Sequence, residues 1–129
     1  MPTLGFAHFN LRAARPVLEE LRAFYSEVVG LRVGERPPFR SFGYWLYAGE
    51  QDVLHLSEAG PDEDRAQRGG TSFDHVAFRC TGRAEFERRL VQRGVRYELA
   101  QVPQTGQRQL FFSDPAGNGV ELSFSADEA

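Results

Sequence analysis

Three histidines and one glutamate lie inside short runs of apolar residues, where polar side chains are uncommon. They are His8, His55, His75 and Glu121, and they include every histidine in the chain. A carboxylate without a partner is costly in an apolar strand, so Glu121 needs a reason to be there. Imidazole and carboxylate groups together are good ligands for a divalent transition metal. The residue types therefore predict a site for one divalent ion, with Zn²⁺, Ni²⁺, Co²⁺, Fe²⁺ and Mn²⁺ as candidates.

An internal repeat relates the four candidate ligands in two pairs. His8 and His75 are 67 positions apart (75 minus 8), and His55 and Glu121 are 66 positions apart (121 minus 55). Two halves with one order of elements indicate a gene duplication, and the halves of such a protein are commonly related by a pseudo-twofold axis. Side chains close to that axis converge on it, so we expect all four to reach a single ion.

Each half reads as a strand, a helix and three further strands, which predicts an α+β fold of two tandem β-α-β-β-β modules. The first module spans about residues 4–58 and the second about 72–125, with a polar linker at 59–71. Within these modules, residues 44–50 align with residues 109–115. The expected strands are 4–11, 31–36, 42–48, 52–58, 72–80, 95–101, 107–113 and 119–125, and the expected helices are 16–30 and 83–93.

The first expected helix has clear boundary signals and an apolar stripe. Pro16 is a good first helical residue, and Gly30 is a good residue to end the helix. Apolar residues follow at steps of three and four, which places them on one face. The stripe of the first helix is Leu18, Leu21, Tyr25 and Val28, and the thinner stripe of the second is Phe86 and Leu90.

Side chains alternate between the two faces of a strand, which predicts the neighbours of each ligand. His55 lies opposite Leu54 and Leu56, so the ligands face away from the apolar side that packs against the helices. Phe6 and Asn10 share a face with His8, and Phe73 shares one with His75. Phe6, Asn10 and Phe73 are therefore candidate substrate contacts.

The composition excludes several classes of protein. The net charge is −3 at pH 7, so the chain lacks the basic footprint of a nucleic-acid-binding protein. No apolar run approaches the roughly 20 residues that span a bilayer, and the first residues do not have the pattern of a signal peptide. Cys80 is the single cysteine, predicted to be an inert buried thiol. We expect a cytoplasmic protein that acts on a small molecule, with no nucleic-acid or membrane partner.

Four segments of the sequence carry a family resemblance that extends over almost the whole chain. They are HFNL (8–11), RAFYSEVVGLRV (22–33), FDHVAF (73–78) and FFSDPAGNGVELSF (111–124), of which the last is the most specific. The chain resembles the vicinal oxygen chelate superfamily, which includes glyoxalase I, extradiol dioxygenases and bleomycin resistance proteins. The resemblance implies paired modules that form a cupped barrel of mixed β-sheet, with the helices outside and one divalent metal ion within.

In that family the ligands fall on the first and last strand of each module, which here are the positions of His8, His55, His75 and Glu121. Short members usually form homodimers, and their sites are often shared between protomers. The metal acts as a Lewis acid on the vicinal oxygens of the substrate. The resemblance thus implies one metal ion per site in a homodimer.

The resemblance leaves three functions open. In a glyoxalase-like lyase or isomerase, Glu121 moves the substrate proton, His55 stands where a glutamate is usual, and Arg12 contacts the carboxylate of a thiol cofactor or is a solvated arginine at the strand end. In an extradiol-type dioxygenase, His8, His75 and Glu121 bind Fe²⁺, and His55 is the acid or base. In a drug-binding resistance protein no metal is bound. We expect the first, because the repeat places His55 on the metal and the tyrosine and further histidine of the dioxygenase class are missing, while the full set of four ligands speaks against a metal-free protein.

Overall fold

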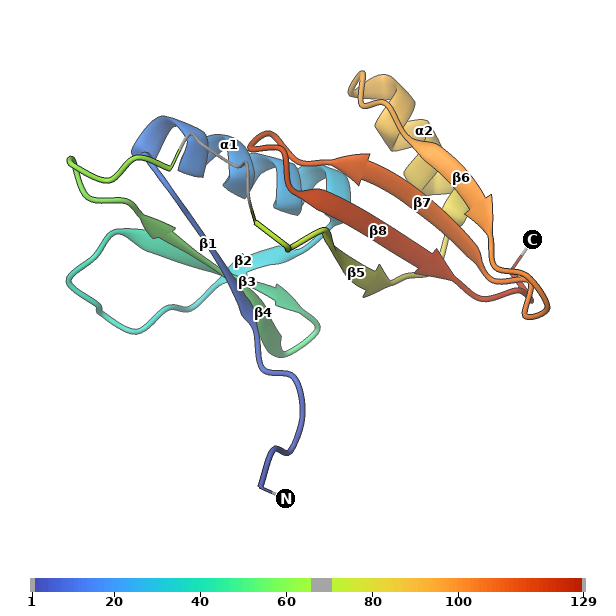
Figure 1. The fold of residues 1–129 in the computed structure, drawn as a ribbon, viewed down its shortest axis with the longest axis horizontal. Coiled ribbons are helices and arrows are strands. Elements are labelled where there is room, and N and C mark those ends of the chain that lie inside the picture. Colours follow the sequence, from blue (N-terminus) through green and yellow to red (C-terminus); the bar gives the residue numbers. More distant parts are fainter. Residues whose placement is uncertain (1, 66–70, 129) are drawn as a thin grey trace. The chain divides into compact units, whose positions relative to one another are not determined.

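A computed structural model describes residues 2–65 and 71–128 of the chain (Figure 1). The chain divides into two compact units, Met1–Gln67 and Arg68–Ala129. Each unit holds one four-stranded mixed sheet and one α-helix, and the order of elements is the same in both. This arrangement confirms the predicted α+β fold of two β-α-β-β-β modules.

The sheet of the first unit has the strand order β1-β4-β3-β2. Its strands are β1 (Phe9–Ala13), β2 (Arg32–Gly34), β3 (Gly43–Ala48) and β4 (Gln51–Glu58). Strands β1 and β4 run parallel, with Asn10 opposite His55, while β3 is antiparallel to both β4 and β2. Leu54 and Leu56 of β4 are fully buried. The alternation predicted for this strand is therefore confirmed, with His55 on the opposite face.

The helix of the first unit begins as an α-helix and ends as a π-helix. Helix α1 (Arg15–Phe24) has a proline in its first turn, and η1 (Tyr25–Val29) continues it as a π-helical turn. Gly30 closes the helix with φ of 92°, a left-handed conformation that glycine adopts without steric cost. The predicted stripe is confirmed, because its four members, Leu18, Leu21, Tyr25 and Val28, are all buried.

The second unit repeats this topology. Its sheet has the order β5-β8-β7-β6, with β5 (His75–Arg79), β6 (Glu98–Gln101), β7 (Arg108–Ser113) and β8 (Gly119–Phe124). Strand β5 is parallel to β8, and the other pairs are antiparallel. Trp45 is the partner of His55 in the first sheet, as Phe111 is of Glu121 in the second. The alignment of 44–50 with 109–115 is therefore wrong by one residue, since it pairs Trp45 with residue 110.

Helix α2 (Arg83–Gln92) packs on its own sheet through few residues. Leu90 is fully buried, and the ring of Phe86 lies 5.9 Å from the ring of Phe124 on β8, measured between centroids. Both members of the predicted stripe therefore contribute to packing. The chain turns at Gly94, which has φ of 67°, before β6 begins.

The first strand of each unit is shorter than predicted. Strand β1 begins at Phe9 instead of residue 4, and β5 begins at His75 instead of residue 72. In the register that places Phe9 opposite Leu54, residue 6 lies opposite Gln51, the first residue of β4, so a strand that began at residue 4 would run past the end of its partner. The same limit applies to β5, because His75 lies opposite Gly119, where β8 begins. Other strand ends coincide with the predicted ones or shift by at most three residues, which is usual for element boundaries.

The strand pairing describes two open sheets, so within the described residues it does not close the barrel that the resemblance implied. Of the predicted linker at 59–71, residues 66–70 lie outside the described part of the chain. Among the described residues, no helix has the length and apolar character needed to cross a bilayer.

A candidate metal centre

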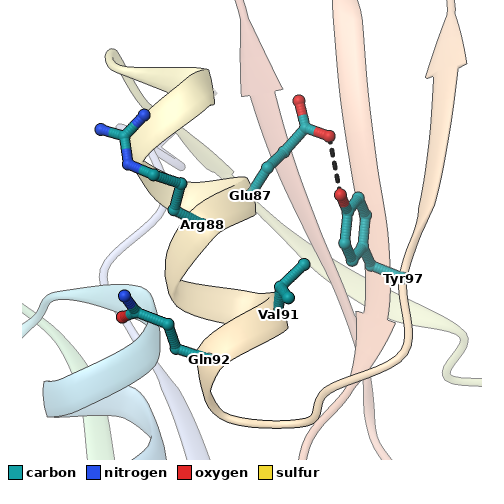
Figure 2. A pocket seen from close by; sticks show the side chains of 5 residues that line it. All are labelled: Glu87, Arg88, Val91, Gln92 and Tyr97. Atoms are coloured by element: carbon teal, nitrogen blue, oxygen red, sulfur yellow. Dashed lines mark hydrogen bonds between the residues drawn. The ribbon is translucent and has the colours of Figure 1, made fainter.

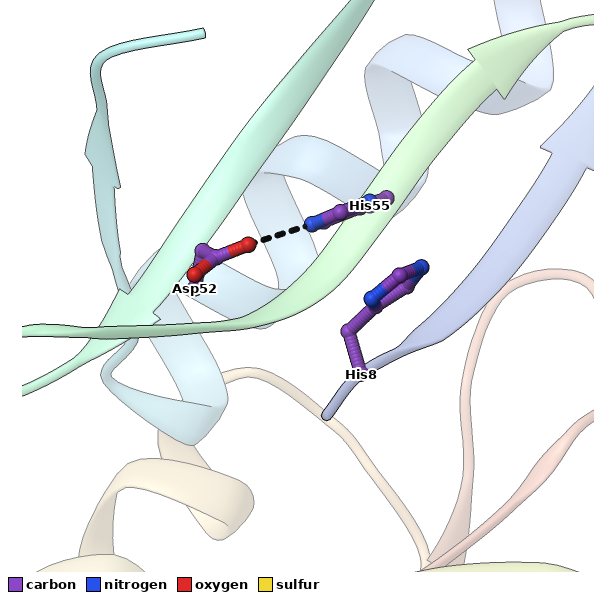
Figure 3. Close-up of side chains that lie close together, drawn as sticks. All are labelled: His8, Asp52 and His55. Atoms are coloured by element: carbon purple, nitrogen blue, oxygen red, sulfur yellow. Dashed lines mark hydrogen bonds and ion pairs between the residues drawn. The ribbon is translucent and has the colours of Figure 1, made fainter. Parts of the chain in front are cut away.

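In the first unit, the two predicted histidine ligands lie face to face (Figure 3). His8 directly precedes β1, and His55 projects from β4, which runs beside β1. Their ring centroids are 3.6 Å apart, with an angle of 18° between the planes. The side chain of His55 is 13% exposed, whereas His8 is exposed. The parallel pairing of β1 and β4 thus brings together two residues that are far apart in the sequence.

A tryptophan covers the other face of the His55 ring. Trp45 is the direct partner of His55 across β3 and β4. The two ring centroids are 4.0 Å apart, and the planes differ by 7°. His55 is therefore held between Trp45 and His8. A metal ion or a hydrogen-bonding partner can reach either ring nitrogen only at the edge of the ring.

An aspartate that the sequence analysis did not single out also contacts His55. Oδ2 of Asp52 lies 2.7 Å from Nε2 of His55 (Figure 3). This hydrogen bond lowers the pKa of Asp52, which keeps the side chain ionised at neutral pH. Among the described residues, His8, Asp52 and His55 each offer a ligand atom, and these atoms lie within 4.8 Å of one another. The group has the composition of a two-histidine, one-carboxylate metal site.

The second unit brings its predicted pair into direct contact. Nε2 of His75 lies 3.1 Å from Oε1 of Glu121, and Nδ1 of His75 lies 2.8 Å from Oδ2 of Asp74. The hydrogen bond to Asp74, followed by the charge of Glu121, raises the pKa of His75. The edge of Phe111 meets the His75 ring at a centroid distance of 5.9 Å. A cation bound by both side chains would take the place of this contact between His75 and Glu121.

Glu121 is 8% exposed, and its second oxygen also has a partner. Nε2 of Gln109, on the adjacent strand β7, donates a hydrogen bond of 3.1 Å to Oε2 of Glu121. The turn before β8 fixes where this strand begins, because the carboxylate of Asp114 accepts hydrogen bonds from the backbone of Ala116 and from Asn118. The carboxylate of Glu121 is thus buried with hydrogen bonds on both oxygens, which offset much of the cost of removing it from water.

The predicted substrate contacts occupy different environments. Asn10 donates a hydrogen bond of 2.9 Å to the hydroxyl of Ser57, on the same face as His55. Arg12 binds both carboxylate oxygens of Glu63 and does not lie free in solvent. Phe6 is 69% exposed and Phe73 is 46% exposed. Both phenylalanines precede their strands, so their contact with the substrate stays a prediction.

A concave feature of the second unit has a lining that does not include these ligands. An open pocket of about 340 Å³ is lined by Glu87, Arg88, Val91, Gln92 and Tyr97 (Figure 2). The hydroxyl of Tyr97 donates a hydrogen bond of 2.8 Å to Glu87. The lining contains no histidine and none of the predicted site residues, so this pocket does not supply the expected chemistry.

The comparison with known families identifies the fold that carries these side chains. Residues 5–122 match the sequence profile of the Glyoxalase/Bleomycin resistance protein/Dioxygenase superfamily. The chain belongs to this superfamily. Members of the superfamily commonly use a divalent metal ion. The histidine and carboxylate groups in each unit are chemically suited to such an ion.

Individual relatives agree with this assignment. Glyoxylase I 4 of Arabidopsis thaliana is 31% identical over 110 residues, which cover 81% of this chain and 63% of that protein. The chain thus spans less than two thirds of that relative. A putative glyoxalase family protein from Bacillus anthracis has a similar structure, with a TM-score of 0.73, 26% identity and coverage of 95% of this chain and 96% of the other.

Lower identities extend the likeness of fold to proteins with different activities. Lactoylglutathione lyase from Agrobacterium tumefaciens has a TM-score of 0.66 at 23% identity and covers 96% of each chain. TnmS3, an antibiotic binding protein from Streptomyces sp. CB03234, has a TM-score of 0.67 at 23% identity, with coverage of 97% of this chain and 98% of the other. One fold therefore serves both an enzyme and a binding protein, and function must be argued from the site.

Proposed function

We propose that this superfamily member is a metal-dependent, glyoxalase-like lyase or isomerase that acts on a small substrate with vicinal oxygens. One observation carries the proposal: each unit brings its own pair of predicted ligands into contact at the same place in the repeat. His8 and His55 stack in the first unit, and His75 and Glu121 share a hydrogen bond in the second. Structural histidines without a common role have no reason to occur in repeat-related pairs.

We assign His8, His55, His75 and Glu121 as the ligands of one divalent ion. Three imidazoles and a carboxylate suit Zn²⁺, Ni²⁺, Co²⁺, Fe²⁺ or Mn²⁺ and are poor ligands for Mg²⁺, which prefers oxygen. When bound, the metal supplies a Lewis acid that polarises the substrate oxygens. The ligands leave room for those oxygens if the ion is five- or six-coordinate.

Glu121 is the residue proposed to move the substrate proton. Its carboxylate is buried, so a bound substrate would exchange a proton with Glu121 directly and not with solvent water. Gln109 holds one oxygen, which leaves Oε1 directed toward His75 and the ion that would bind there. His55, the other proposed catalytic residue, is covered on both faces of its ring and acts by binding and orienting at its edge.

Arg12 and Asn10 are proposed to contact the substrate. Both project from β1, and both reach toward Ser57 on β4, so they line one continuous strip beside His55. The guanidinium of Arg12 already binds a carboxylate, that of Glu63, in a two-oxygen arrangement. An acidic substrate or thiol cofactor would use the same geometry after displacing Glu63.

The first experiment measures metal content and activity together. Purified protein is loaded with each of the five metals and assayed with the hemithioacetal of a 2-oxoaldehyde and a thiol. We expect about one ion per chain and isomerase activity, and we expect Glu121→Gln to lower kcat by at least about 100-fold. Glu98→Gln is the matched control, because Glu98 is an exposed carboxylate in the same unit.

Three outcomes would overturn the proposal. If the purified protein binds no metal ion but binds a drug molecule with high affinity, then it is a drug-binding protein and not an enzyme. Uptake of oxygen with catechols in the Fe²⁺-loaded protein would indicate a dioxygenase. Equal activity of the Glu121→Gln and Glu98→Gln variants would remove Glu121 from the reaction.

We also propose that the protein is a homodimer whose sites combine residues of two protomers. Each unit supplies only half of the proposed ligand set, so a complete site needs one unit of each kind.

A further inference from the structure

The pairing of β3 with β4 contains an irregularity beside His55. Leu46 lies opposite Leu54, but Ala48 lies opposite Gln51, so the register shifts between them. Asp52 and Val53 therefore share the place opposite Tyr47, which is the pattern of a β-bulge. In an unbroken strand, Asp52 would lie on the face of Leu54, away from His55. The bulge turns the side chain of Asp52 toward the face of His55, where the Asp52 carboxylate contacts Nε2 of His55.

The second unit has no such irregularity. The pairing of β7 with β8 continues without a shift from Arg108 opposite Phe124 to Ser113 opposite Gly119. The position that corresponds to Asp52 is Asn118, 66 positions later (118 minus 52), and its side-chain amide donates to Asp114 instead. The contact between an acidic side chain and the last-strand ligand is thus a property of the first unit.

We propose that Asp52 is a positioning residue that keeps the proton of His55 on Nε2 and so leaves Nδ1 as the metal-binding nitrogen. This inference rests on the proposed function, in which His55 is a ligand. An ionised carboxylate can only accept hydrogen bonds, so the nitrogen that faces it must carry the proton. A separation of 2.7 Å is typical of a charge-assisted hydrogen bond. A neutral imidazole with its proton on Nε2 has its free electron pair on Nδ1.

The two rings stacked on His55 keep its Nε2 directed toward Asp52. A ring flip would bring Cε1 to the place of Nε2 and break the hydrogen bond to Asp52, and it requires the His55 ring to turn out of its plane. Trp45 on one side and His8 on the other leave no space for that turn at centroid distances of 4.0 Å and 3.6 Å. The two stacked rings therefore fix the plane of His55, and Asp52 selects the tautomer within that plane.

The decisive measurement is made on the metal-free protein. Long-range ¹H–¹⁵N NMR of the imidazoles distinguishes the two tautomers, and His55→Ala identifies the signal. We expect the Nε2–H tautomer in the wild type and in Asp52→Asn, whose amide oxygen can still accept the hydrogen bond. In Asp52→Ala we expect a mixture of tautomers. A wild-type protein with the proton on Nδ1, or an Asp52→Ala variant with an unchanged tautomer, would overturn the inference.

Metal affinity gives the second readout, measured by competition with a chromogenic chelator for Zn²⁺. Loss of a partner that orients a ligand typically weakens binding by about 10- to 100-fold, which we expect for Asp52→Ala. Asp62→Ala, which removes an exposed carboxylate of the same unit, should bind as the wild type does. If Asp52→Asn is as defective as His55→Ala, then Asp52 is itself a ligand and the inference is wrong.

The two proposals fail in different ways. A wild-type protein that does not bind Zn²⁺, or an unchanged affinity in His55→Ala, contradicts the proposed metal centre. Normal Zn²⁺ binding in Asp52→Ala, with clear loss in His55→Ala, contradicts only the role of Asp52. If Asp52→Ala does not fold, Asp52→Leu takes its place, because leucine has nearly the size of aspartate but no acceptor, and we expect the same mixture of tautomers from it.

Discussion

At the scale of single residues, the surroundings of His55 give it a built-in optical reporter. Trp45 is the single tryptophan of the chain, and its indole lies flat on the His55 ring. Excited indole loses energy readily to a neighbour at van der Waals contact, so any change in the charge of His55 alters its emission. A side chain that packs the sheet thus also reports on the candidate metal centre.

We predict that Co²⁺ or Ni²⁺ quenches the fluorescence of Trp45 as the site fills, because both ions have open d shells and would bind within a few ångströms of the indole. Titration of the metal-free protein, followed at the emission maximum of tryptophan, measures this. His55→Ala should abolish the saturable component. Saturable quenching of equal size in that variant would place the ion elsewhere.

Cys80 offers a pH-dependent prediction. Burial, followed by the nearby charge of Glu128, raises the pKa of the Cys80 thiol to about 11. The thiolate is the reactive form, so its fraction should rise about tenfold per pH unit up to that value. Allowing for the greater nucleophilicity of a more basic thiolate, alkylation at pH 8 should be roughly 10- to 100-fold slower than in the unfolded chain.

Iodoacetamide, followed by mass spectrometry in buffer and in urea, tests this expectation for Cys80. The predicted inertness of the thiol fails if the folded and unfolded chains react at the same rate.

At the scale of the elements, one glycine sets how closely β5 approaches β8. A Cβ atom added to Gly119 would lie 2.9 Å from Cβ of His75 and closer still to the carbonyl oxygen of Asp74. The second of these neighbours is backbone, so the strain cannot be relieved by turning a side chain. Gly119 is therefore needed to place His75 beside Glu121.

Gly119→Ala should lower the free energy of unfolding by about 1–3 kcal/mol, the usual cost of overpacking, and it should weaken metal binding because His75 is displaced. Urea denaturation and the chelator competition measure the two effects. Gly5→Ala is the matched control, since nothing lies within 4 Å of the added atom there. If Gly119→Ala is as stable as Gly5→Ala, then β5 can shift to accommodate the added methyl group and Gly119 is not required.

The elements also show what a sequence can and cannot predict here. Hydrophobic periodicity predicted the helices and the face of His55 because the apolar stripe and the alternation are regular there. Asp52 was missed because a bulge breaks the alternation on which the prediction rests, and no turn residue marks it. The predicted starts of β1 and β5 lie beyond the first residues of their partner strands, and the sequence of one strand alone does not contain that limit.

At the scale of the whole molecule, the repeat was the most informative signal. Two pairs of residues at offsets of 66 and 67 positions predicted two modules, and both sheets have the same strand order. That prediction succeeded because duplication copies topology and register together. The one-residue error for 44–50 arose because both segments are short runs of aromatic and aliphatic residues that resemble each other in either alignment, and only the strand pairing of Trp45 with His55 and of Phe111 with Glu121 decides between them.

Mixing of two inactive variants tests whether sites are shared between protomers. His55→Ala and Glu121→Ala should each be inactive alone. If each site combines one unit from each protomer, half of the randomly mixed dimers are heterodimers with one intact site of two, so about a quarter of wild-type activity should return. Co-refolded mixtures are assayed against each variant alone. No recovery would mean that each site is built within one chain.

The bulge in β4 has a consequence for how the two halves differ. Two identical copies of a module would offer the same chemistry twice. Trp45 and His55 are ten positions apart (55 minus 45), as are Phe111 and Glu121 (121 minus 111), so a local shift of pairing with no added residue altered the surroundings of one imidazole, while the ladder of the other copy is uninterrupted. Divergence of this kind lets one half acquire a specialised role at little cost to folding.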